Sequence, residues 1–311
     1  MFRDIKEIIN TSYVDFEKCI YWEKINEAIL LSESMIIHYP WSDVTALYFL
    51  GTIGRNDYTA QSHGFKRVFG VANYNEKQVC IVGADNNIIN MVLSLCSENL
   101  KELTVMFTDN VEIDLQGHVG IEGISVEHNT NMRLHNLSNL GRMKNIYIRN
   151  ADIGLQIDLC WWKELFRLIL DNVSINRILV NENMNTIKNM FLYNLGITHY
   201  DFLERFPNLE RLGLKGENVT DLDNVILPSG IKDLRLYNVK IRHLPESLRN
   251  LYQIKKLDLW NLQLETLPDW IPELGLSFHS GDKIIGMGGT CVADMDMSLF
   301  KQLCLIMSYI G

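Results

Sequence analysis

The sequence predicts an α/β solenoid, a stack of short repeats whose strands form one parallel sheet. Segments with apolar residues in the order LxxLxL recur along most of the chain, as in NLERLGLKGENV and GIKDLRLYNVKI. A fixed period of 20 to 50 residues is typical of repeat architectures. The second apolar position of each segment, called the marker position below, returns every 21 to 23 residues, at Leu103, Ile124, Ile146, Leu168, Met190, Leu212, Leu234 and Leu257.

Residues 1–77 precede the repeats and do not share their period. We expect them to form an N-terminal cap, either helical or a small α/β unit, because an uncovered solenoid end would expose apolar core and a strand edge. Ile25, Ile29 and Ile36 lie on one helical stripe. The segment VTALYFLGTI, residues 44–53, is typical of a buried strand or of a short helix closed by glycine.

Residues 78–278 are predicted to be the solenoid itself, with about nine repeats. The first repeat is degenerate, since Ile81 lies 22 residues before Leu103 but Gly83 stands where a leucine is expected. In each repeat the central LxL is predicted to be a strand with alternate side chains inward. Pro245 and Pro268 mark short helical turns on the return across the back, because proline fixes φ.

Residues 279–311 are predicted to form a C-terminal capping segment that contains a helix. The helix is expected because five apolar residues follow helical spacing, namely Leu299, Phe300, Leu303, Ile306 and Ile310. The glycine cluster IIGMGGT, residues 284–290, lacks the Lys-Ser/Thr pair of a phosphate-binding loop. A tight turn before the capping helix accounts for its glycines.

The repeated segments resemble the leucine-rich repeats, whose signature is LxxLxLxxNxL. The resemblance covers about residues 78–278 and is strongest in residues 241–271, IRHLPESLRNLYQIKKLDLWNLQLETLPDWI. That stretch is similar to the LP-containing repeats that are common in bacterial and plant members. The resemblance implies a curved arc with a parallel β-sheet on its concave face, and a function in recognising other proteins.

The asparagines depart from that family pattern. The family places one asparagine five residues after the marker, where this chain has Asn129 in one repeat only. In five other repeats an asparagine falls one place earlier, at Asn150, Asn172, Asn194, Asn238 and Asn261. One interpretation is a turn in which asparagine takes left-handed backbone angles while the next residue packs inward. The other is an outward row of side chains available to a ligand.

The outward side chains of the predicted strands lie one and three places after each marker. They include large aromatic and basic residues, the mixture that is enriched at binding hot spots. The predicted partner-binding residues are Tyr147, Arg149, Phe191, Tyr193, Lys215, Arg235, Tyr237 and Trp260. Strand propensity alone also enriches aromatic residues, although it does not require them to point away from the core.

Charge and composition narrow the classes of function. The chain has 29 basic and 38 acidic residues, a net charge of −9, which argues against a nucleic-acid partner. On the outward strand face, however, basic residues outnumber acidic ones, which favours an acidic protein or peptide partner. No apolar run is long enough to span a bilayer, and the N-terminus lacks the order of a signal peptide, so a cytoplasmic location is expected.

No motif for catalysis, metal binding or cofactor binding is recognisable. The eight histidines form no HExxH, the six cysteines form no CxxC pair, and no GxSxG is present. The sequence therefore predicts no catalytic residues, no metal and no cofactor. The primary hypothesis is a non-enzymatic module that binds a protein on its concave sheet. Alternatives are an effector or toxin-like enzyme active in residues 1–77, and a structural or regulatory subunit that uses its convex face.

Overall fold

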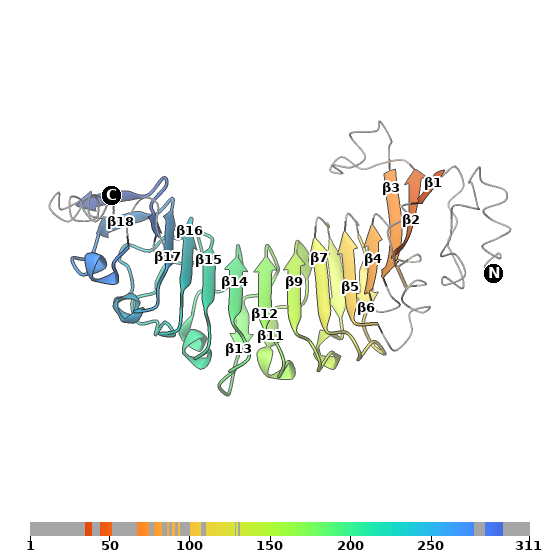
Figure 1. The fold of residues 1–311 in the computed structure, drawn as a ribbon, viewed down its shortest axis with the longest axis horizontal. Helices are drawn as coiled ribbons and strands as arrows, with labels where there is room; N and C mark the ends of the chain where they lie inside the picture. Colours follow the sequence, from red (N-terminus) through yellow and green to blue (C-terminus); the bar gives the residue numbers. More distant parts are fainter. Residues whose placement is uncertain are drawn as a thin grey trace. The chain divides into compact units, whose positions relative to one another are not determined.

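A computed structural model describes residues 100–106, 110–127, 129, 131–276 and 284–294, positions 86, 89, 90 and 93, and the strands at 35–38, 44–51, 67–74 and 78–82. The chain divides into two compact units, Met1–Ile153 and Gly154–Gly311. Strands are the main elements of both units (Figure 1).

The first unit is built on a sheet whose later part is parallel. Its strands follow the order β1 (Met35–His38), β2 (Val44–Gly51), β3 (Arg67–Tyr74), β4 (Gln78–Val82), β5 (Glu102–Met106), β7 (Gly123–Glu127) and β9 (Asn145–Arg149). β1 to β4 pair antiparallel, whereas β4, β5, β7 and β9 pair parallel. Residues 44–51 are therefore a strand. Ile36, expected on a helical stripe, instead pairs with Phe49 across β1 and β2, in keeping with the strand preference of β-branched residues.

The second unit carries the parallel sheet that the repeats predict. Each strand pairs with the next in the order β12 (Arg167–Asp171), β14 (Asn189–Tyr193), β15 (Arg211–Lys215), β16 (Asp233–Tyr237), β17 (Lys256–Trp260) and β19 (Ile284–Gly286). The predicted leucine-rich-repeat solenoid is confirmed by this arrangement of one short parallel strand per repeat.

Short elements complete each repeat. In the first unit they are β6 (Glu112–Asp114), β8 (Met132–His135) and β10 (Ala151–Asp152), which form a small parallel sheet, and the 3₁₀ helix η3 (Leu137–Asn139). In the second unit β11 (Gln156–Asp158) pairs with β13 (Arg177–Leu179), and β18 (Gln263–Thr266) pairs with β20 (Cys291–Asp294). The returns contain the 3₁₀ helices η4 (Leu159–Trp161), η5 (Asp201–Arg205), η6 (Glu246–Asn250) and η7 (Ile271–Leu274). Pro245 caps η6, as expected, and the Pro268 carbonyl accepts the backbone N–H of Ile271 at the start of η7.

The strand register confirms the marker positions. Leu234 lies opposite Leu212 on one side and Leu257 on the other, and the remaining markers pair in the same way within each unit. The marker assigned to the first repeat was wrong, because Val79 and not Ile81 lies opposite Leu103. A shift of two residues keeps a strand side chain on the same face, so Ile81 is still fully buried.

The strand series continues beyond residue 278. Leu257 lies opposite Ile285, so β19 places a further marker inside the glycine cluster of residues 284–290. These glycines therefore belong to a sheet strand and the turn that follows it, where a turn alone was expected. The residues predicted to form the capping helix, 299–310, lie outside the described residues.

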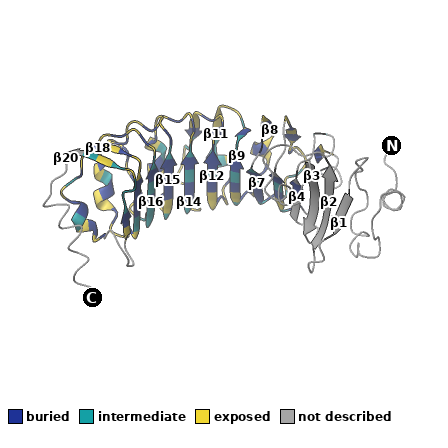
Figure 2. Ribbon diagram, turned by 90° about the horizontal axis from the view of Figure 1, so that it is seen from above, coloured by how far each residue is buried: buried dark blue, intermediate teal, exposed yellow. Residues whose placement is uncertain are grey.

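The markers and the inward residues that flank them form the core. Leu212, Leu214 and Leu257 are fully buried. Figure 2 shows the resulting dark stripe along the strands of the second unit, with exposed residues between. Among the described residues the largest fully buried side chains are Trp162, Tyr200 and Phe206, which lie at the ends of the 3₁₀ helices η4 and η5. Because no single repeat could bury these residues alone, the stacking of neighbouring repeats stabilises each one.

The displaced asparagines occupy left-handed turns. Their φ angles lie between 52° and 55° at Asn150, Asn172, Asn194, Asn238 and Asn261. Asparagine tolerates this region better than most residues. The residues that follow them, among them Val173, Leu195 and Leu262, are buried. The turn interpretation is therefore confirmed, and Gly216 and Gly289 take the same place in their own repeats with φ of 127° and 68°. Asn129 is buried, and its Nδ2 donates to the Val105 carbonyl at 3.3 Å.

A repeated ion-pair arrangement joins strands at their amino ends. In the second unit, Glu210 accepts from Lys188 at 2.9 Å and from Lys232 at 3.0 Å. In the first unit, Glu122 pairs in the same way with Lys101 at 3.0 Å and Lys144 at 2.7 Å. One carboxylate thus links three successive repeats, and the hydrogen bonds from both lysines lower the pKa of Glu210 to about 2.

This arrangement predicts an acid-dependent contribution to stability. Because the folded-state pKa of Glu210 lies below the usual 4.5, its contribution is complete above pH 4.5 and is lost as the pH falls toward 2. The glutamate is partly exposed, so we expect a contribution of about 1 kcal/mol or less. Urea unfolding of the wild type and of Glu210→Gln should differ at pH 6, and the difference should shrink steadily as the pH falls from 4.5 toward 2. A difference that stays constant over this range would contradict the assignment.

Candidate binding surface

Aromatic side chains gather on the outward face of β14 to β17. The rings of Phe191 and Tyr193 meet edge to face with centroids 6.0 Å apart, and those of Tyr193 and Tyr237 lie 6.4 Å apart. Trp260, on the neighbouring strand β17 opposite Tyr237, is 51% exposed. These four residues, called the aromatic strip below, occupy the two outward columns of the sheet. Two of them lie on β14, one on β16 and one on β17, while β15 carries Gly213 and Lys215 at the same positions.

A glycine on β15 and a glycine in the turn after β19 make room for these rings. A Cβ atom on Gly213 would lie 2.5 Å from Phe191 Cδ1 and 2.7 Å from the Tyr193 hydroxyl. A Cβ atom on Gly288 would lie 2.8 to 2.9 Å from three atoms of the Trp260 ring. Real contacts of a Cβ atom are longer than this, so the rings lie where only glycine permits them. The sequence offers glycine at these outward positions, but its link to the rings needs the strand register.

Arg235 is fixed between the strip and a carboxylate. Its guanidinium donates two hydrogen bonds to Asp233, at 2.9 and 2.7 Å, and lies 5.7 Å from the centre of the Phe191 ring. The bonds to Asp233 raise the pKa of Arg235 above its ordinary value. Bidentate pairing and contact with a ring face both suit the planar guanidinium. Because these contacts already fix Arg235 in one position, its side chain loses little conformational entropy when a partner binds.

A buried carboxylate supports the other end of the strip. Asp258 is 7% exposed, accepts a hydrogen bond from the Tyr237 hydroxyl at 3.0 Å, and pairs with Lys256 at 3.0 Å. Burial, with the bond to Asp258, raises the pKa of Tyr237 to about 12, and burial raises the pKa of Tyr193 to about 12. Both phenols are therefore neutral at physiological pH. The Tyr237 hydroxyl donates its hydrogen to Asp258, and its oxygen can still accept a hydrogen bond from a partner.

The predicted binding residues fall into two groups. Phe191, Tyr193, Lys215, Arg235, Tyr237 and Trp260 all lie on β14 to β17. Tyr147 and Arg149 occupy the same two columns on β9, in the first unit, and both are half-buried. The sequence reasoning did not select Asp233, Asp258 and the glycines under the rings as parts of this surface. The same outward alternation that selected the aromatic residues could have pointed to Asp258 and Gly213, but not to their contacts.

The basic excess on this face is smaller than the sequence count suggests. On this face of the second unit, four basic residues are paired with carboxylates, namely Lys188, Lys232, Arg235 and Lys256. Among the described residues of the same face, Arg167, Arg211, Lys215 and Lys255 have no such partner. Charges that attract a partner are thus concentrated on these four side chains, while the paired ones position neighbouring groups.

Gly213 provides a test of how the strip is held. We expect Gly213→Ala to push the rings of Phe191 and Tyr193 off their present positions, because its Cβ would overlap both. The cost in stability should be about 1 kcal/mol, since outward rings can move toward solvent. The near-ultraviolet circular dichroism of the tyrosines should change while the far-ultraviolet spectrum does not. Gly141→Ala is the matched control because a Cβ there meets nothing within 4 Å; equal near-ultraviolet spectra for both variants would contradict the role of Gly213.

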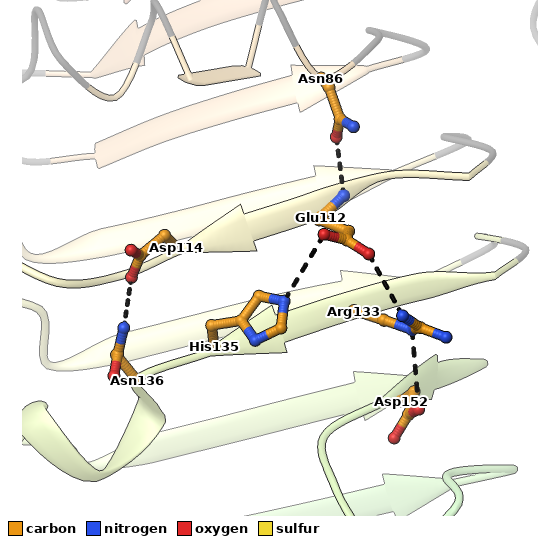
Figure 3. Close-up of polar contacts among 7 residues, drawn as sticks. All are labelled: Asn86, Glu112, Asp114, Arg133, His135, Asn136 and Asp152. Atoms are coloured by element: carbon orange, nitrogen blue, oxygen red, sulfur yellow. Dashed lines mark hydrogen bonds and ion pairs between the residues drawn. The ribbon is translucent and has the colours of Figure 1, made fainter.

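A second polar cluster lies in the first unit, on the small sheet of β6, β8 and β10 (Figure 3). Arg133 lies between Glu112 at 3.3 Å and Asp152 at 3.9 Å. His135 Nε2 is 3.9 Å from Glu112, and Asn136 donates to Asp114 at 2.6 Å. The Asn136 bond lowers the pKa of Asp114. Each side chain in this cluster contacts a neighbour in an adjacent repeat, so its evident role is to join the repeats.

The part of the chain that the structure describes contains neither a metal-binding cluster nor a membrane-spanning helix. No group of three or more His, Cys, Asp or Glu side chains there could hold a metal ion. No helix in that part has the length and apolarity needed to cross a membrane. Cys160 and Cys291, whose side chains the structure describes, are free thiols.

Comparison with curated proteins finds one relative that is described as containing leucine-rich repeats. A scan against protein-family models finds no match. The chain is 26% identical over 175 residues to an uncharacterized leucine-rich repeat-containing protein of Amsacta moorei entomopoxvirus. That match spans 55% of this chain and 31% of the viral protein. A solved leucine-rich-repeat protein of Leptospira interrogans is similar over 66% of this chain and 53% of its own, with a TM-score of 0.47 and 16% identity.

Proposed function

We propose that this leucine-rich-repeat protein is a non-enzymatic recognition module that binds a protein or peptide through the outward face of β14 to β17. The observation that carries the proposal is the aromatic strip, in which four large side chains stand on the solvent face of a sheet. Strand propensity alone does not account for rings seated on glycines and braced by Arg235 and Asp258.

The properties of the strip are those of a binding hot spot. Tyr, Trp and Arg dominate hot spots because they supply large contact areas with few rotatable bonds. Here neighbouring groups already hold Phe191, Tyr237 and Arg235 in place, which reduces the entropy lost on association. The four basic residues without carboxylate partners favour an acidic segment in the partner. Tyr147 and Arg149 hold the equivalent columns on β9 of the first unit and are proposed as binding residues of that unit.

Replacing Tyr193, Tyr237 and Trp260 together with alanine tests the proposal. The immobilised wild type and the triple variant are compared for the proteins they retain, read by mass spectrometry and then by titration of each purified candidate. We expect partner affinity to fall at least 100-fold, because hot-spot truncations cost about 2 kcal/mol or more each. Tyr252→Ala is the matched control, since Tyr252 is 79% exposed but lies after η6, away from the strip.

The fold must be shown to survive in that experiment. The three side chains point away from the core, so the far-ultraviolet spectrum of the triple variant should match that of the wild type. Its urea midpoint should fall only modestly, because Asp258 loses the Tyr237 hydrogen bond but keeps its pairing with Lys256. If the folded triple variant retains the same partners with the same affinity, the proposed surface is wrong. The alternative of an active N-terminal segment concerns residues 1–77, where the structure describes only the strands at 35–38, 44–51 and 67–74 and none of their side chains. The cytoplasmic location remains a prediction.

A further inference from the structure

A groove with a volume of about 820 Å³ lies along the turns at the carboxyl ends of the strands in the second unit. Its floor contains Val239, Ile241 and Leu264, which are buried, and its walls carry the polar side chains of β18 and of the turns before it. Ligand sites in proteins commonly enclose 300 to 1,000 Å³. The groove borders the strip but none of the four strip residues lines it, so it is a separate surface.

The groove follows the row of left-handed turns. Asn194, Gly216, Asn238 and Asn261 take the same position in four successive repeats and all line it. Gly216 interrupts the row of asparagine side chains and leaves space between Asn194 and Asn238. The glycine cannot be replaced freely, because its φ is 127° and a Cβ atom would lie 3.2 Å from Asn194 Cα.

The charges in the groove cancel one another. Glu217 pairs with Lys240 at 2.6 Å, and Arg242 pairs with Glu265 at 3.1 Å. A phosphate group or a nucleic acid therefore gains no net attraction here. The residues that line the groove also include no aromatic ring on which a sugar or a base could stack. A ligand without net charge that bonds through its own polar backbone suits the groove better than either.

The carboxamides of the groove provide hydrogen bonds of that kind. Asn261 Nδ2 donates to Asn238 Oδ1 at 2.7 Å. This bond uses the Asn261 donor and the Asn238 acceptor. The Nδ2 donor of Asn238 and the Oδ1 acceptor of Asn261 have no partner among the described residues, and neither does the side chain of Gln263. A carboxamide offers the same donor and acceptor as a peptide group, so the row can bond the backbone of another chain.

The spacing of the row agrees with an extended polypeptide. Adjacent strands lie 4.7 to 4.9 Å apart, so residues two repeats apart, such as Asn194 and Asn238, are separated by roughly 9.5 Å. Asn194 Nδ2 donates to Asp171 at 2.8 Å, so Asn194 offers a ligand its Oδ1 acceptor while Asn238 offers its Nδ2 donor. Three residues of a polyproline II chain advance about 9.3 Å, and its backbone groups make no internal hydrogen bonds. We propose that this groove binds an uncharged, extended peptide segment that runs along the row of turns, with one backbone bond per two repeats.

Exchange of asparagine for glycine can test this proposal without disturbing the turns, since Gly216 and Gly289 already occupy equivalent positions. The probe is a phage-displayed library of random dodecapeptides, selected on the full chain. Selected peptides should bind the double variant Asn238→Gly/Asn261→Gly at least 10-fold more weakly than the wild type. Asn150→Gly, the same exchange at a turn of the first unit, should bind them as the wild type does.

Cys291 allows the position of a bound peptide to be read independently. It is an exposed free thiol that lines the groove, so a bound peptide should slow its alkylation by a maleimide at least 5-fold, measured by mass spectrometry of the fragment that contains it. The proposal is overturned if no peptide is enriched. It is also overturned if enriched peptides bind the double variant normally and leave Cys291 reactive, or lose binding only when Tyr193, Tyr237 and Trp260 are replaced.

Discussion

Replacing Leu234 with aspartate should unfold the middle of the second unit. Leu234 is 1% exposed and lies between the markers Leu212 and Leu257 of the neighbouring repeats. A carboxylate there would have no hydrogen-bond donor and would lose its hydration, and the leucine contacts would be lost as well. We expect a loss of about 4 kcal/mol or more, at the upper end of single substitutions. In a chain of stacked repeats such damage spreads through the interfaces of adjacent repeats.

Thermal unfolding followed by circular dichroism, together with limited proteolysis, measures this effect. The variant should lose a large part of its ellipticity at 25 °C and become sensitive to protease within β15 to β17. Leu234→Ala should cost about 2 to 5 kcal/mol, and Gln253→Asp, at an exposed position, should have little effect. A Leu234→Asp protein that melts like the wild type would show that this position does not belong to the core.

The parts of the fold that the sequence predicts are those in which each repeat obeys the same constraint. Every marker must be apolar and must face its equivalent in the next repeat, so a regular period is enough to place Leu168 opposite Met190. Where the repeat length changes, this reasoning fails. The spacing from Val79 to Leu103 and the spacing from Leu257 to Ile285 are both longer than the regular period. A search at the regular spacing therefore selected Ile81 and stopped at Leu257.

The candidate surface could be predicted in part for a related reason. Strand alternation decides which side chains leave the core, and it selected the four aromatic residues of the strip. It does not decide how those side chains lie. Their positions depend on contacts within and between strands. Phe191 packs against Gly213, Arg235 is bonded to Asp233, and Tyr237 is bonded to Asp258. The groove beside the row of turns is lined by residues of four successive repeats, and no residue pattern indicated a hollow there.

A β-branched residue in the row of asparagine turns should cause the second large loss of stability. Asn238 has a φ of 52°, a conformation that costs an ordinary L-residue about 1 to 2 kcal/mol and a β-branched residue more. Asn238→Val should therefore lower the free energy of unfolding by about 2 kcal/mol, whereas Asn238→Gly should stay within about 0.5 kcal/mol of the wild type, because glycine adopts this angle without strain.

Urea unfolding of the two variants separates the backbone from the side chain. Both substitutions remove the acceptor that Asn238 Oδ1 offers to Asn261, so they differ mainly in the strain at φ and in the greater freedom that glycine has in the unfolded chain. If both variants lose the same stability, the hydrogen bond and not the turn explains the asparagine. If only the valine variant is destabilised, the asparagine row is needed for backbone geometry. Its outward carboxamides are then available for a ligand without being required for the fold.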